Sequence, residues 1–137
     1  MNKTIVECPF CNLKKEIEII SETESCIAFY DGFPVNPGHA LIIPKRHVSN
    51  YFELTRDEVL EMQEMLWYVK KVIDERYHPD GYNIGVNVNE SAGQSIFHVH
   101  MHLIPRYKDD KVNVGWEPGS IDENGIDELK KLIEKEL

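Results

Sequence analysis

The chain has 137 residues, which is enough for one domain built around one hydrophobic core. Its hydrophobic content of 42% and charged content of 28% are typical of a soluble globular protein. The N-terminus has no apolar signal region and no apolar run approaches the length of a membrane span, so we expect a cytoplasmic protein without a membrane partner. A net charge of −9 without any basic cluster argues against nucleic acid as a partner, although local donors could still hold a small anionic substrate.

The first motif is Cys8-Pro-Phe-Cys11, a pair of cysteines near the start of the chain. In a reducing compartment this spacing indicates a metal-binding or redox pair rather than a structural disulfide. Residues 15–20 alternate like a strand, whereas the redox motif requires a helix after the cysteines. We therefore favour a zinc ion completed by His47 and His98, and the alternative is a surface turn with two idle thiols.

The next two segments are predicted strands. In residues 25–31 the alternation of side chains puts Phe29 and Asp31 on one face. Asp31 could hold a sugar hydroxyl beside a base stacked on an aromatic ring, or it could simply end the strand before a turn. Residues 39–44 form the following predicted strand, and His39 at its start is either a satisfied structural histidine or part of a site.

The clearest predicted helix covers residues 55–77. Thr55 can cap its first turn, and Glu58 completes a capping box. Trp67 lies off the apolar stripe, which predicts that it belongs to an interface between molecules. The stripe repeats at spacings of three and four residues and consists of Val59, Met62, Leu66, Val69 and Ile73.

Residues 82–88 and 97–104 predict two strands with a short connection, which implies an antiparallel hairpin. We expect its apolar face to pack under the long helix, while Asn87 lies on the other face beside the histidines. The apolar spacing in residues 125–137 predicts a short C-terminal helix. The whole sequence, residues 1–137, is predicted to form a single domain without repeats.

Three of the six histidines stand two residues apart within the predicted strand 97–104. Because side chains on a strand alternate between faces, His98, His100 and His102 point to one side. The opposite side is apolar and is formed by Phe97, Val99, Met101 and Leu103. Fold stability gives no reason for three imidazoles on one face, so this face is predicted to be functional.

Two mechanisms fit these histidines. In the first, all three hold a catalytic zinc ion with a bound water, although no carboxylate is evidently placed as a base. In the second, the central His100 attacks phosphorus, and a hydrogen bond on its other ring nitrogen fixes the tautomer. Neutral donors for the phosphate and the leaving group would then be Asn87, Gln94 and Ser95.

Residues 94–104, Gln-Ser-Ile-Phe-His-Val-His-Met-His-Leu-Ile, resemble the signature of the histidine triad (HIT) superfamily, in which histidines alternate with apolar residues. Other segments resemble family segments in the family order, namely residues 28–31, 38–47, 81–87 and 105–106. The resemblance as a whole covers roughly residues 5–107, and chance agreement of all these segments is implausible.

This resemblance implies an α+β, HIT-like fold with an antiparallel sheet of about five strands, one long helix and a short C-terminal helix, and the count of predicted strands agrees. It also implies a homodimer. The implied activity is that of a nucleotidyl hydrolase or transferase that forms a nucleotidyl-histidine intermediate. The substrates would be purine nucleotides or dinucleotides, such as dinucleoside polyphosphates, nucleoside phosphoramidates or adenylylated compounds.

The resemblance also implies roles for individual residues. His100 matches the nucleophile, and His102 matches the histidine that contacts phosphate. Other contacts to phosphate and the leaving group would come from Asn87, Gln94 and Ser95. The ribose-binding acid would be Asp31, and the aromatic residues of the base pocket would be Phe10 and Phe29.

In the zinc-bearing branch of the superfamily, the four ligands match Cys8, Cys11, His47 and His98, so the zinc would be structural. Two other functions stay open, namely a tri-histidine zinc hydrolase and a nucleotide-binding module without turnover. Hydrolase, phosphorylase and transferase are not distinguished by the sequence.

Overall fold

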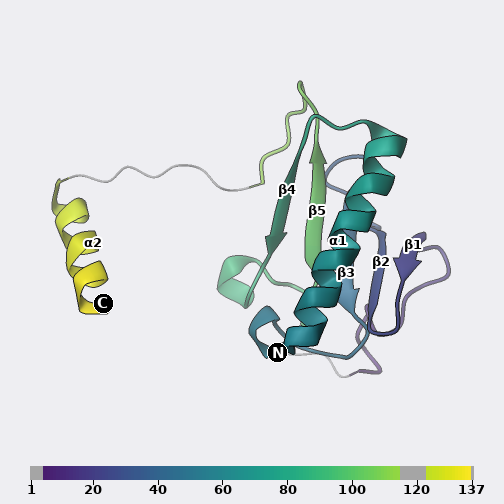
Figure 1. Cartoon of the computed structure of the whole chain (residues 1–137), viewed down its shortest axis with the longest axis horizontal. Helices are drawn as coiled ribbons and strands as arrows, with labels where there is room; N and C mark the ends of the chain where they lie inside the picture. Colours follow the sequence, from purple (N-terminus) through teal and green to yellow (C-terminus); the bar gives the residue numbers. More distant parts are fainter. Residues whose placement is uncertain (1–4, 115–122, 137) are drawn as a thin grey trace.

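The computed structural model describes residues 5–114 and 123–136 (Figure 1). In this part of the chain five strands form one antiparallel sheet in the order β1-β2-β3-β5-β4, which confirms the expected α+β fold. The strands are β1 Ile19–Glu22, β2 Cys26–Tyr30, β3 Ala40–Pro44, β4 Gly81–Val86 and β5 Met101–Arg106. The helices are α1 Arg56–Tyr77 and α2 Glu123–Glu136, with short 3-10 turns η1 Tyr51–Glu53 and η2 Glu90–Ala92.

Strand β5 lies between β3 and β4, so the histidine segment leads into a strand with partners on both sides. His102 is opposite Leu41 of β3 and opposite Gly85 of β4. Backbone hydrogen bonds to two neighbours hold this position more firmly than an edge strand could.

Helix α1 covers one face of the sheet (Figure 1). Thr55 accepts a hydrogen bond from the Glu58 backbone N–H while the Glu58 carboxylate accepts one from the Thr55 N–H, so the predicted capping box is present. The buried core between helix and sheet includes Met62, Leu66, Val69 and Ile73 from the helix and Cys26, Ala28, Ile42, Val99, Met101 and Leu103 from the sheet side.

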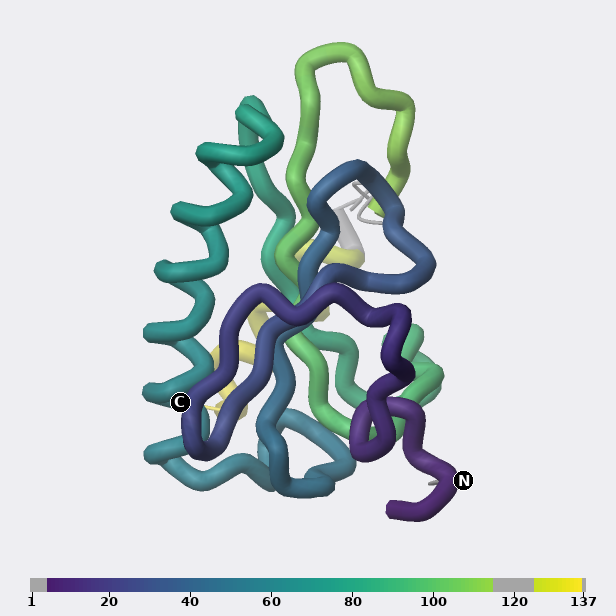
Figure 2. The backbone as a smooth tube through the Cα atoms, turned by 90° about the vertical axis from the view of Figure 1, so that its right-hand side faces the viewer, coloured from purple at the N-terminus to yellow at the C-terminus, as the bar shows by residue number. Residues whose placement is uncertain are grey.

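The other face of the sheet is covered by the N-terminal segment, which crosses the strands in Figure 2 (purple). Phe10, Leu13 and Ile17 pack there against a second buried cluster formed by Ile27, Phe29, Leu41 and Ile43. The alternation predicted for residues 25–31 is therefore confirmed, because even-numbered residues face α1 and odd-numbered residues face the N-terminal segment.

The histidine strand is shorter than expected, because β5 begins at Met101 rather than at residue 97. Met101 is the last residue on this side that has partners, Ile42 on β3 and Val86 on β4; β4 ends there, and the chain before Met101 does not pair with Ile43 and Pro44, with which β3 continues. The Val99 N–H instead donates to the Val48 carbonyl, at 2.8 Å. Phe97, which was expected in the core, is only half-buried.

Strand β4 also differs from the predicted range 82–88, since it covers Gly81–Val86. Ile84, expected under the helix, is 52% exposed on this edge strand, although its neighbours Tyr82 and Val86 pack against the core under α1. Trp67 is exposed, as its position off the stripe predicted. Trp116, the other tryptophan of the chain and by sequence a second candidate for an interface, lies outside the described residues.

Helix α2, predicted for residues 125–137, carries four exposed apolar residues, Ile126, Leu129, Leu132 and Ile133. Among the helices described here, none is both long enough and apolar enough to span a membrane.

Candidate functional site

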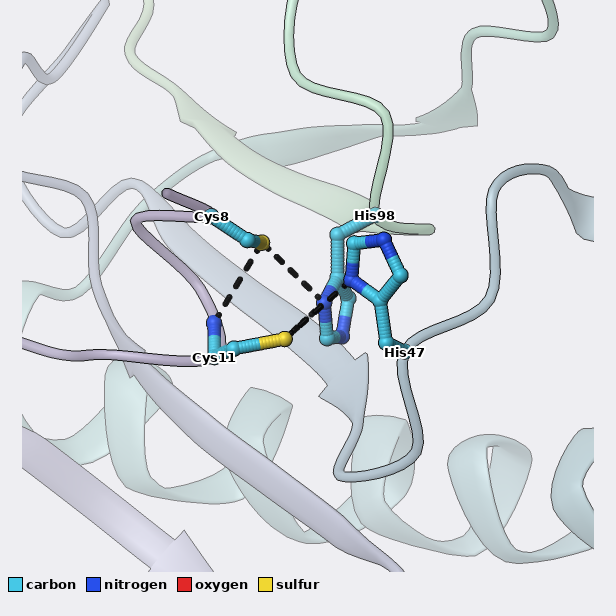
Figure 3. A group of neighbouring side chains, drawn as sticks. All are labelled: Cys8, Cys11, His47 and His98. Carbon is cyan, nitrogen blue, oxygen red and sulfur yellow. Dashed lines mark hydrogen bonds between the residues drawn. The ribbon is translucent and has the colours of Figure 1, made fainter. Parts of the chain in front are cut away.

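Two cysteines and two histidines from three distant parts of the chain converge beside the sheet (Figure 3). Cys8 and Cys11 come from the N-terminal turn, His47 follows β3, and His98 precedes β5. Their ligand atoms all lie within 4.8 Å of one another. The sequence nominated these four residues, and the structure brings all four together.

The distances in this cluster fit a tetrahedral ion. Cys11 Sγ is 3.1 Å from His47 Nδ1 and 3.4 Å from His98 Nδ1, and Cys8 Sγ is 3.5 Å from His98 Nδ1. Bonds of about 2.3 Å to sulfur and about 2.0 Å to nitrogen in a tetrahedron separate these atoms by about 3.5 Å. A site with two thiolates and two imidazoles matches the donors that zinc prefers.

Protonation in the cluster also suits a cation. The Nε2–H of His98 donates to the Pro44 carbonyl at 2.7 Å, so the Nδ1 lone pair is directed at the thiols. Burial and the adjacent Cys8 raise the pKa of the Cys11 thiol to about 11. A bound cation would oppose both effects and favour the thiolate.

A cavity of about 370 Å³ lies between the N-terminal segment and the strands. Its apolar walls include Leu13, Ile17 and the two aromatic residues nominated for the base pocket, Phe10 and Phe29. The rings of Phe10 and Phe29 meet edge to face with centroids 5.6 Å apart. Other residues nominated from the sequence also line this cavity, namely Asp31, Ser95, His100 and His102.

His100 is buried beside Phe10, with ring centroids 5.1 Å apart. Its Nδ1–H donates to the His98 carbonyl at 2.8 Å, because a carbonyl oxygen can only accept. Burial lowers the pKa of His100, so the ring is neutral near pH 7 and Nε2 carries a lone pair. This nitrogen can act as a nucleophile.

Neutral His102 carries its proton on Nε2, the opposite of His100, because of a hydrogen bond from His39. The Val35 N–H donates to His39 Nδ1 at 3.0 Å, so the proton of neutral His39 is on Nε2. That N–H donates to His102 Nδ1 at 3.0 Å, which leaves His102 with its proton on Nε2. Burial, helped by His100 and His39, lowers the pKa of His102 to about 4. Neutral His102 therefore offers an N–H donor where His100 offers a lone pair.

Asp31 lies beside the hydrogen-bonded pair of His39 and His102. Its Oδ2 lies 3.5 Å from His39 Nε2, while its Oδ1 accepts from the Phe33 N–H at 2.9 Å. His39, left open by the sequence, is thus part of the site through its contact with His102. In the sequence, the only indication of this role was the position of His39 at the start of a predicted strand. The pairing of β3 with β5 is what brings His39 to the triad.

The three neutral donors nominated from the sequence have different surroundings. Ser95 is exposed and lines the cavity beside His100. Asn87 is half-buried on the other side of His102. Gln94 is buried, and its side chain is fully used by the backbone around it, because it accepts from the Asn89 N–H and donates to the Ser49 and Ile96 carbonyls. Gln94 therefore holds the loop that carries Ser95, and its amide is not directed at a phosphate.

The tri-histidine zinc site considered above does not form among the described residues. His98 joins the cysteine cluster, and the His102 Nδ1 is already occupied by His39. The other group with metal-ligand character, Asp31, His39 and His102, is linked by the same hydrogen bonds.

Comparison with known proteins agrees with this geometry. The family model described as the HIT domain matches residues 12–109, most of the chain. The chain belongs to the HIT domain family.

Three known proteins illustrate the range of this family. An adenosine 5′-monophosphoramidase of Schizosaccharomyces pombe is 32% identical over 136 residues, which covers 96% of this chain and 99% of the relative. A bis(5′-adenosyl)-triphosphatase of Dictyostelium discoideum is 36% identical over 101 residues, or 74% of this chain and 68% of the relative. The crystal structure of a zinc-bound histidine triad family protein from Mycobacterium smegmatis superimposes with a TM-score of 0.73 at 28% identity. The match covers 96% of this HIT chain and 99% of the M. smegmatis chain.

Proposed function

We propose that this HIT protein is a nucleotidyl hydrolase or transferase in which His100 attacks the phosphorus of a purine nucleotide. The observation that carries the proposal is the tautomer of His100, whose Nδ1–H is held by the His98 carbonyl while Nε2 is unprotonated at the cavity. The names of its hydrolytic relatives support a reaction at a nucleoside phosphate.

The first step forms a bond between His100 Nε2 and phosphorus and breaks the bond from phosphorus to the leaving group, which departs with the electron pair. In hydrolysis, water then attacks phosphorus and releases His100. Overall, the hydroxyl of that water ends on phosphorus and its proton on the leaving group. The His102 Nε2–H and the Ser95 hydroxyl would donate hydrogen bonds to the phosphoryl oxygens.

The nucleoside would lie in the cavity beside the N-terminal segment. Phe10 and Phe29 offer aromatic surface to a purine base, and Asp31 offers a carboxylate to ribose hydroxyls. The apolar residues Leu13 and Ile17 extend this surface, which favours a base over a charged group.

We propose a structural zinc ion held by Cys8, Cys11, His47 and His98. When bound, it would supply a rigid link between the N-terminal turn and the segment before β5. His98 belongs to this group and also supplies the carbonyl that holds His100, so the cluster would orient the nucleophile. Thiols that serve as ligands must stay reduced, which agrees with a cytoplasmic location.

The test is to trap the intermediate. During turnover of adenosine 5′-phosphoramidate or diadenosine triphosphate, we expect mass spectrometry to find an acid-sensitive adenylyl group on His100. His100→Ala should lose activity on the order of 10⁶-fold, the scale seen when a catalytic-triad nucleophile is removed, and should still bind adenosine monophosphate. His78→Asn is the control, because His78 is exposed at the end of α1 and Asn tolerates its left-handed backbone.

An adenylyl group on Ser95 would contradict this mechanism. If the chain binds adenosine monophosphate but cleaves neither substrate, it is a nucleotide-binding module instead.

A further inference from the structure

A second cavity, of about 410 Å³, adjoins the metal-ligand cluster formed by Cys8, Cys11, His47 and His98. Cys11 and His47 line this cavity together with apolar residues of the strands and of the N-terminal segment. Cys8 and His98 are fully buried and are not part of the lining. The cluster is therefore open on one side, and Cys11 carries the sulfur that a reagent in this cavity reaches first.

The two sulfurs can be joined by a small local movement. Cys8 Sγ and Cys11 Sγ lie within 4.8 Å of each other, and both side chains point toward His98 (Figure 3). The Cys11 N–H also donates to Cys8 Sγ at 3.4 Å. A disulfide bond is about 2.05 Å long, so the sulfurs need to approach by less than about 3 Å. Two cysteines separated by two residues have the spacing of reversible redox pairs.

The third thiol of the chain is protected from the same reagent. Cys26 is fully buried under α1, and burial, with Glu61 nearby, raises the pKa of its thiol to about 11. A protonated thiol reacts slowly, because the thiolate is the nucleophile. A cation held by Cys8 and Cys11 would keep both of their sulfurs unprotonated. Oxidation of the chain should therefore be selective for the N-terminal pair.

Phe10 connects the cysteine pair to the nucleoside cavity. It lies between the two cysteines in the sequence, and the centroid of its ring is 5.1 Å from that of His100 and 5.6 Å from that of Phe29. The same side chain lines both the first and the second cavity. A rearrangement of the turn that carries the cysteines therefore moves a wall of the nucleoside cavity.

The metal-ligand cluster is also what ties this turn to the rest of the protein. The Asn12 side chain donates to the carbonyls of Ile5, Val6 and Cys8, at 2.8, 3.2 and 2.9 Å, so these bonds stay within the N-terminal segment. The links from the turn to the strands are apolar packing and the sulfur contacts with His47 and His98. Loss of the cluster would loosen the turn.

We propose that Cys8 and Cys11 form a redox-sensitive modification site, at which a hydroperoxide joins the two sulfurs as a disulfide, releases the metal ion and opens the nucleoside cavity at Phe10. This inference adds regulation to the proposed function and rests on it for the effect on nucleotide binding.

The reaction consumes one hydrogen peroxide. Cys11 Sγ attacks one peroxide oxygen, the O–O bond breaks, and a sulfenic acid and hydroxide form. Cys8 Sγ then attacks Cys11 Sγ, which forms the S–S bond and expels a second hydroxide. Both hydroxides take a proton from solvent, so two thiolates lose two electrons and the peroxide becomes two waters. The disulfide sulfurs have no negative charge to offer a cation, and metal affinity is lost.

The first experiment follows the thiols and the metal. Purified protein is treated with hydrogen peroxide in small molar excess, and released zinc is measured with the chelating dye 4-(2-pyridylazo)resorcinol. We expect loss of zinc together with a disulfide, detected by mass spectrometry as a peptide containing Cys8 and Cys11 that is lighter by two hydrogen atoms. Dithiothreitol and zinc should restore the starting protein. A protein that contains no zinc as purified, keeps its zinc under peroxide, or is oxidised first at Cys26 would overturn the inference.

Two variants separate this pair from the third thiol. Cys11→His keeps a zinc ligand but cannot form a disulfide, so it should retain its zinc under peroxide. Cys26→Ala removes the buried thiol and should behave like the wild-type protein. Zinc loss from Cys11→His at the wild-type rate, or protection in Cys26→Ala, would contradict the assigned pair. If Cys11→His does not fold, the wild-type and Cys26→Ala results decide.

The second experiment follows the nucleoside cavity. Calorimetry gives the affinity for adenosine monophosphate before oxidation, after oxidation, and after reduction in the presence of zinc. We expect oxidation to weaken binding by about 10- to 100-fold, the scale on which a base loses an aromatic partner, and reduction to restore it. Phe10→Leu should bind more weakly from the start and lose less than about threefold on oxidation, while it releases zinc as the wild-type protein does.

The outcomes distinguish this inference from the proposed function. If the reduced protein binds no adenosine monophosphate, the proposed function fails, and the zinc and mass measurements still test the thiol reaction. If the oxidised protein, with its disulfide formed and its zinc lost, binds adenosine monophosphate as tightly as the reduced protein, the cysteine pair does not control the nucleoside cavity and the inference is wrong.

Discussion

The three imidazoles of the triad stand two residues apart, yet each presents a ring nitrogen in a different setting. His98 directs a bare Nδ1 at the cysteines because Pro44 holds its Nε2–H. His100 has a bare Nε2 because its Nδ1–H is bonded to a carbonyl, and His102 has a protonated Nε2 because His39 donates to its Nδ1. Hydrogen-bond partners, rather than residue type, assign the roles of ligand, nucleophile and donor.

His39 should therefore affect catalysis without contacting substrate. His39→Phe removes the donor to His102 Nδ1 and frees the ring to adopt the other tautomer. We expect kcat to fall by about tenfold with little change in KM, as for loss of an orienting group. His39→Gln keeps an N–H at similar reach and should recover part of the activity. Equal kcat values for the wild-type protein and the Phe variant would refute this role.

The lowered pKa of His102 makes stability depend on pH. The folded-state value of about 4 lies below the ordinary 6.5, so between these values the unfolded chain binds a proton that the folded chain does not. The free energy of unfolding should therefore fall as pH drops from about 6.5 to about 4. The groups that face His102 are His100, His39 and Asp31, and only Asp31 opposes the shift.

The measurement is urea denaturation at pH 7 and pH 5 of the wild-type protein and His102→Gln. Protonation of the metal-ligand cluster is common to both proteins, so the difference between their pH dependences isolates His102. An equally steep loss of stability in the variant would contradict the assignment.

At the scale of elements, the N-terminal turn is tied to the sheet by the Cys8, Cys11, His47 and His98 cluster. Cys8→Ser should lose most of the bound zinc and lower the free energy of unfolding, because metal binding is coupled to folding. Elemental analysis of purified protein measures the metal. Cys26→Ala is the matched control, since Cys26 is buried under α1 and away from the cluster. Full zinc content in Cys8→Ser would rule out the assigned ligands.

Helix α1 depends on its own first turn. Thr55→Ala removes the acceptor for the Glu58 N–H and should destabilise the protein by about 1 kcal/mol, the usual value of such a cap. Glu58 also binds Arg46, at 3.0 and 2.7 Å, and Arg46 directly precedes His47. Thermal unfolding measures the loss, and the zinc content should stay unchanged. A stability equal to that of the wild-type protein would show that the cap is dispensable.

At the scale of the whole molecule, we propose a homodimer through α1. Trp67 is 71% exposed, and Leu60 and Tyr68 on the same helix are also exposed. Trp67→Glu should give a monomer by light scattering at micromolar concentration, because a buried carboxylate at an interface is costly. Phe52→Glu is the control, since Phe52 is also exposed, at 80%, but lies on η1. A monomeric wild-type protein would exclude this arrangement.

The sequence by itself determined the features that depend on local periodicity. The alternation in residues 25–31 put Phe29 and Asp31 on one face, and both line the first cavity. The spacing of Thr55 and Glu58 predicted the helix start. The cysteine pair and the surplus of histidines nominated the members of the metal-ligand cluster before any contact was known. Such patterns can be recognised in a sequence because side-chain direction repeats every two residues in strands and every 3.6 residues in helices.

Only the tertiary structure decided what depends on partners far along the chain. His98 is held by Pro44, 54 residues away, and His102 is held by His39, 63 residues away, so their tautomers follow from the register of β3 against β5. The use of Gln94 within its loop and the second cavity beside Cys11 arise in the same way. Hydrogen-bond partners and cavities are set by which segments meet, and a pattern within one segment carries no information about the segment it will meet.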